Sequence, residues 1–79
     1  MNNTKESKRA TTRIQVAIAI NERGWHGVHL YRDRKGNYYF SGGVADKFHT
    51  QGVCVCRLTD WTVEEWIAEF ERKAAEVAV

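Results

Sequence analysis

The segment from Trp61 to Val77 constrains the fold most, because its apolar residues recur with the period of an α-helix. They fall on one stripe that is roughly 100° wide, and the charged residues lie outside it. Thr62 and Glu65 have the spacing of a capping box, and Trp61 and Trp66 stand where a hydrophobic staple would close over that cap. The stripe consists of Val63, Trp66, Ile67, Phe70, Ala74 and Val77. We therefore predict one amphipathic helix, which needs a second layer to cover its apolar face.

The second layer is predicted from alternating polar and apolar residues between Arg13 and Phe40. Ile14, Val16, Ile18 and Ile20 alternate with polar or small residues, a pattern typical of a half-buried strand. The segments 21–24 and 33–36 each begin with Asn or Asp and end with Gly, as three-residue hairpin turns do. The sequence thus predicts a three-stranded meander. Its expected register sets Ile18 against Val28, Leu30 against Phe40 and Arg32 against Tyr38.

Residues 53–58 alternate again and predict a fourth strand, whereas 44–52 shows no assignable pattern. Together these elements predict an α+β fold: a four-stranded, mostly antiparallel sheet covered on one face by the C-terminal helix. A chain of 79 residues has one small core and forms one domain. Residues 1–12 are polar and without periodicity, so we expect a flexible N-terminal arm followed by a single domain over 13–79.

Charge is unevenly spread, although the formal net charge is only +2. Residues 1–59 contain ten Lys or Arg against four Asp or Glu, whereas residues 60–79 contain two against six. We expect a basic end and an acidic helix, an asymmetry that indicates binding without identifying the ligand. No apolar run is long enough to cross a bilayer, and the polar start lacks the apolar part of a secretory signal. A cytoplasmic protein that does not bind membranes is therefore expected.

The candidate partner-binding surface lies on the predicted sheet face that is turned away from the helix. Tyr31 and Tyr39 should be direct cross-strand neighbours there, in one row with Gln15 and next to His29. Such a pair either stabilises the sheet, by roughly 0.2–1 kcal/mol, or forms a binding platform of rigid rings with polar tips. The predicted second turn gathers positive charges beside Arg13. The candidate residues are Arg13, Gln15, His29, Tyr31, Arg32, Arg34, Lys35 and Tyr39.

No catalytic, metal-binding or cofactor-binding pattern emerges from the sequence. Cys54 and Cys56 are separated by one residue, which spaces two thiols poorly for zinc, and His49 adds only one further ligand type. We expect both cysteines to point inward, where burial raises a thiol's pKa and suppresses nucleophilic chemistry. A Gly-rich phosphate loop, a Ser-His-Asp arrangement and paired acids are all missing from the sequence. We therefore expect no enzyme and no cofactor.

The leading functional hypothesis is a small interaction protein that binds and inhibits or modulates a larger protein or ribonucleoprotein complex. This profile resembles that of phage-encoded inhibitors of host defence, including anti-CRISPR proteins, which would act in the host cytoplasm. The alternative is a nucleic-acid-binding domain, with bases stacked on the tyrosines and phosphates on the basic turn. In element order the chain looks like small DNA-binding domains that lay a three-stranded sheet in the major groove. Either a monomer or a homodimer agrees with the sequence.

Overall fold

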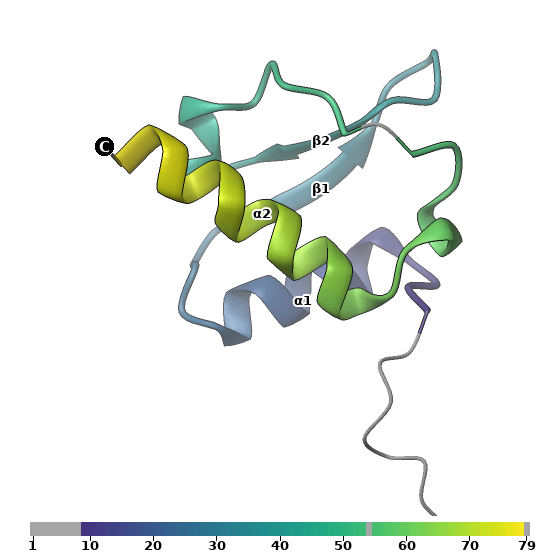
Figure 1. Cartoon of the computed structure of the whole chain (residues 1–79), viewed down its shortest axis with the longest axis horizontal. Helices are drawn as coiled ribbons and strands as arrows, with labels where there is room; N and C mark the ends of the chain where they lie inside the picture. Colours follow the sequence, from purple (N-terminus) through teal and green to yellow (C-terminus); the bar gives the residue numbers. More distant parts are fainter. Residues whose placement is uncertain (1–8, 54, 79) are drawn as a thin grey trace, which may run out of the picture.

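The computed structural model describes residues 9–53 and 55–78, which form a small α+β fold around one β-hairpin (Figure 1). Helix α2 crosses the inner face of this hairpin, and helix α1 contacts both α2 and the first strand. Two short 3₁₀ helices, Gly43–Lys47 and Leu58–Asp60, lie in the connection between hairpin and α2. The elements are α1 (Arg13–Glu22), β1 (His29–Arg32), β2 (Tyr38–Ser41) and α2 (Val63–Ala78).

The C-terminal amphipathic helix is confirmed as α2, together with its start signals. The N–H of Thr62 donates to the Glu65 carboxylate at 2.8 Å, and the N–H of Glu65 donates to the Thr62 hydroxyl at 3.1 Å. The rings of Trp61 and Trp66 pack edge to face with centroids 4.8 Å apart. Both the capping box and the staple are therefore present.

The hairpin over 29–41 is also confirmed, with the predicted register. Leu30 pairs with Phe40, and Arg32 pairs with Tyr38. The side chains of Leu30, Tyr38 and Phe40 are buried on one face of the hairpin. Phe40 contacts Trp66 and Phe70 of α2 edge to face, so the hairpin and α2 share one aromatic core.

The predicted strand over 13–20 is wrong, because this segment forms α1. Thr12 caps the helix by accepting from the N–H of Gln15 at 3.0 Å. Since residues four apart share a helical face, Val16 and Ile20 are buried together. Ile14 and Ile18, which an alternating strand would have buried with them, instead lie on the opposite side and are exposed. The predicted turn at 21–24 is the end of this helix.

The four-stranded sheet is therefore wrong as well, since the only sheet among the described residues has two strands. The described residues of the segment 53–58 do not form a fourth strand. Val53 makes one isolated bridge to Tyr38, and Leu58 begins a 3₁₀ helix. Cys56 is exposed rather than inward-facing, whereas Cys54 lies outside the described residues.

Two segments without a predicted regular structure contribute to the core. The segment 44–52 includes most of the first 3₁₀ helix, and Phe48 at its end packs against Phe40 and Phe70. Within 1–12, where we expected an arm, Arg9 forms a bridge with Thr62, and Ala10 is buried. Residues 1–8 of that expected arm lie outside the described residues.

Candidate functional site

The hairpin turn is organised by the carboxylate of Asp33. Its Oδ1 accepts hydrogen bonds from the backbone N–H groups of Lys35 and Asn37, each at 2.9 Å. The hydrogen bond from Asn37 is the main reason why the pKa of Asp33 lies below its ordinary value of 3.8. Gly36 adopts a φ of 93°, in the region that favours glycine. The turn therefore holds the neighbouring positive charges in a defined place.

The tyrosine pair predicted on the outer face is present. Tyr31 and Tyr39 are direct cross-strand partners, and their rings stack with centroids 5.3 Å apart and planes 21° apart. Tyr39 is half-buried with Gly52 close behind its ring, whereas Tyr31 remains 37% exposed. Desolvation and then the negative charge of Asp33 raise the pKa of the Tyr39 hydroxyl above its ordinary value of 10.0.

Three basic side chains lie at or beside the turn. Arg34 and Lys35 are exposed on the turn itself. Arg32 lies on the inner face of the hairpin, with its guanidinium carbon 5.9 Å from the centroid of the Tyr38 ring. Within residues 9–53 and 55–78, none of the three has a carboxylate within 4.0 Å. Their charge is therefore available to a partner.

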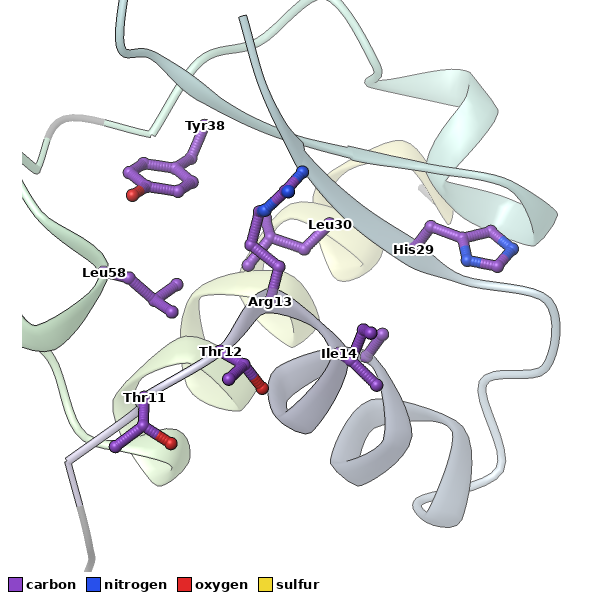
Figure 2. A pocket seen from close by; sticks show the side chains of 9 residues that line it. Thr11, Thr12, Arg13, Ile14, His29, Leu30, Tyr38 and Leu58 are labelled. Carbon is purple, nitrogen blue, oxygen red and sulfur yellow. The ribbon is translucent and has the colours of Figure 1, made fainter.

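Arg13 and His29 both line a hollow of about 520 Å³ between α1 and β1. Figure 2 shows Arg13 reaching from the start of α1 towards β1, with Tyr38 and Leu58 on one side and His29 and Ile14 on the other. His29 is exposed and lies two residues before Tyr31, on the same face of β1. The hollow and the tyrosine pair are thus neighbouring surfaces.

Gln15 does not lie in a row with the tyrosines, because the strand that would have placed it there is helix α1. Its Oε1 accepts from the backbone N–H of Thr11 at 2.8 Å and from the Thr11 hydroxyl at 3.1 Å. The Gln15 side chain therefore orders the approach to α1. It is the candidate residue that the structure removes from the tyrosine face.

Sequence reasoning missed the most exposed large apolar residues of the described chain. Ile14 is 72% exposed and Ile18 is 53% exposed, one helical turn apart on α1. A signal for this helix was present, since Thr12 and Gln15 have the spacing of a capping box. If Thr12 is taken as an N-cap, the segment after it is predicted to be a helix. The four alternating isoleucine and valine residues then fall on two different faces.

The His, Cys, Asp and Glu side chains of the described residues are not clustered as metal ligands are. No group of three or more His, Cys, Asp or Glu side chains within 9–53 and 55–78 is placed to hold a metal ion. His49 bonds the backbone carbonyl of Asp46 at 2.8 Å rather than a carboxylate. What this surface offers a ligand is therefore contact area, hydroxyls and positive charge.

Comparisons with known proteins add no family to this description. Neither a protein-family model, nor a curated protein, nor a solved structure matches the chain. In the part of the chain that the structure describes, neither helix has the combination of length and apolar character that crossing a bilayer requires.

Proposed function

We propose that this chain is a non-catalytic interaction protein that binds a larger protein or ribonucleoprotein through its hairpin. The contact surface, here called the hairpin surface, consists of His29, Tyr31, Arg34, Lys35 and Tyr39. The observation that carries the proposal is the stacked tyrosine pair on the open face of the hairpin, beside positive charges that lack carboxylate partners among the described residues. Occupying a partner's surface in this way would inhibit or modulate the partner without chemistry.

The character of the surface supports a protein partner with an acidic patch. Tyrosine is enriched at interface hot spots because it supplies rigid apolar area together with a polar tip. Here the two rings cover each other, and Gly52 lies behind Tyr39, so Tyr31 offers the larger free surface. A base-stacking platform would need ring faces open to successive bases. Carboxylates on the partner would complement Arg34 and Lys35 at the rim of the contact.

The proposal can be tested by affinity capture from cell lysate, run in parallel with and without nuclease treatment. We expect a protein complex that survives the treatment and that Tyr31→Ala/Tyr39→Ala weakens by about 30-fold or more, as the loss of a hot spot of at least 2 kcal/mol requires. Lys47→Gln is the matched control, because this exposed residue follows β2 at the end of the hairpin opposite the turn. Circular dichroism would verify that each variant is folded.

Each other outcome would count against the proposal. Recovery of nucleic acid alone, with binding that falls by orders of magnitude between about 50 mM and 200 mM salt, would establish the nucleic-acid alternative. A complex that the tyrosine variant leaves intact would place the contact elsewhere on the molecule.

A further inference from the structure

Helix α1 carries an apolar ridge on its outer side that the hairpin surface does not use. Ile14 and Ile18 are exposed one turn apart, and Glu22 continues the same row at the end of the helix. A row of residues spaced by four is the ridge that packs into the grooves of another helix. We call Ile14 and Ile18 the α1 ridge.

A hollow lies on each side of the α1 ridge. One, of about 540 Å³, is bordered by Ala17, Val28 and His29. The other, of about 490 Å³, is bordered by Gln15, Ala19 and Val63. The small alanine side chains keep both hollows open beside the large isoleucines. The surface therefore presents a ridge with a hollow on each side, so that the ridge of one copy can enter a hollow of another.

The charges at the ends of α1 indicate which partner fits. Arg13 is the first residue of the helix and Glu22 is the last, and each stands at the end where the helix dipole disfavours its charge. Among the described residues, neither has an oppositely charged group within 4.0 Å. An antiparallel second α1 would bring the end with Arg13 close to the end with Glu22, and would oppose the two helix dipoles.

We infer that two copies of this chain associate through their α1 ridges in an antiparallel, two-fold symmetric dimer. Such an interface uses the same patch on both subunits, and α1 carries both the apolar ridge and the two complementary charges that this symmetry requires. A ten-residue helix on each side gives a small contact, so the dimer is weak, with dissociation in the micromolar range or above. This inference does not depend on the proposed function.

Sedimentation velocity from about 10 μM to 1 mM protein, a range chosen to bracket weak affinities, tests the dimer. We expect a concentration-dependent shift from monomer to dimer, and Ile14→Gln/Ile18→Gln should weaken association at least about tenfold while circular dichroism keeps its helical signal. Lys47→Gln is the control, because it changes an exposed residue outside both the α1 ridge and the hairpin surface and should leave the dimer unchanged. A monomer throughout the range, or association unaffected by the isoleucine variant, would overturn the inference.

Charge reversal separates dimerisation from folding. Arg13→Glu places a negative charge at the helix N-terminus, where it should stabilise the monomer. The same change should weaken the dimer, because the introduced carboxylate of each copy would then face Glu22 of the other. Adding Glu22→Arg should restore association. If Arg13→Glu strengthens the dimer, or if the double reversal fails to restore it, the antiparallel arrangement is wrong.

Discussion

Three side chains at the start of α2, those of Thr62, Glu65 and Trp66, fix the beginning of the helix through hydrogen bonds. Thr62 and Glu65 exchange hydrogen bonds, and Trp66, one residue further on, also donates from its ring N–H to the carbonyl of Leu58 at 3.1 Å. The capping box follows from local spacing, so it could be predicted. The bond to Leu58 depends on how the chain returns to the core, which no local pattern encodes.

Glu69 links two cations on α2 and should make stability depend on pH. Its carboxylate contacts Arg72 at 2.8 Å and the buried Lys73 at 3.4 Å. Burial raises the pKa of Glu69, but the hydrogen bond and charge of Arg72, together with Lys73, outweigh it and hold the pKa below its ordinary value of 4.5. Because the folded pKa is depressed, this stabilisation is present above pH 4.5 and is lost as pH falls through the folded pKa.

Glu69→Gln should therefore flatten the pH dependence of the free energy of unfolding below pH 4.5. Urea denaturation at a series of pH values measures it. Glu64→Gln is the matched control, because Glu64 is exposed on the same helix and forms none of the described ion pairs. The same pH profile in wild type and Glu69→Gln would show that this network does not stabilise the folded chain.

At the level of secondary structure, the sequence of α1 fits both a strand and a helix. Alternating apolar residues at 14, 16, 18 and 20 satisfy a strand, but the same set contains two pairs spaced by four, 14 with 18 and 16 with 20, as a helix does. Because one pair is buried and the other exposed, α1 has apolar residues on opposite sides and lacks a one-sided stripe. The hairpin over 29–41 was predictable, since its turn chemistry and its alternation agree. Assigning α1, by contrast, required tertiary information.

The connection between β2 and the first 3₁₀ helix depends on a glycine at position 42. Gly42 has a φ of 85°, and a Cβ there would collide with the carbonyl oxygen of Gly27. Gly42→Ala should therefore lower the free energy of unfolding by about 2 kcal/mol or more, through backbone strain and this clash together. Chemical denaturation measures the loss.

The matched control for this substitution is Gly24→Ala. Gly24 has a similar φ of 100°, but a Cβ there would meet nothing within 4 Å. Gly24→Ala should therefore lower the free energy of unfolding only through backbone strain. Gly42→Ala should lower it by more. Equal losses in the two variants would mean that the approach of Gly27 to Gly42 is not a tight constraint.

For the whole molecule, charge is arranged differently from its distribution along the sequence. The carboxylates of α2 are largely paired within the fold: Glu71 with Arg23, and Glu69 and Glu76 with Arg72. The basic turn has no such pairing within the described residues. The predicted acidic helix is thus partly neutralised, whereas the positive charge at the hairpin surface remains open to a partner.

The fold and the α1 ridge both depend on the segment 13–22 being a helix, because only then are Ile14 and Ile18 exposed while Val16 and Ile20 enter the core. Solution NMR chemical shifts test this most directly. We predict Cα shifts above random-coil values throughout 13–22. Cross-strand backbone contacts should appear in the hairpin over 29–41 and at the bridges Tyr38–Val53 and Arg9–Thr62, but not between 13–20 and 26–32. Cα shifts below random-coil values in 13–20, together with a backbone contact between Ile18 and Val28, would contradict helix α1. They would support the three-stranded meander instead.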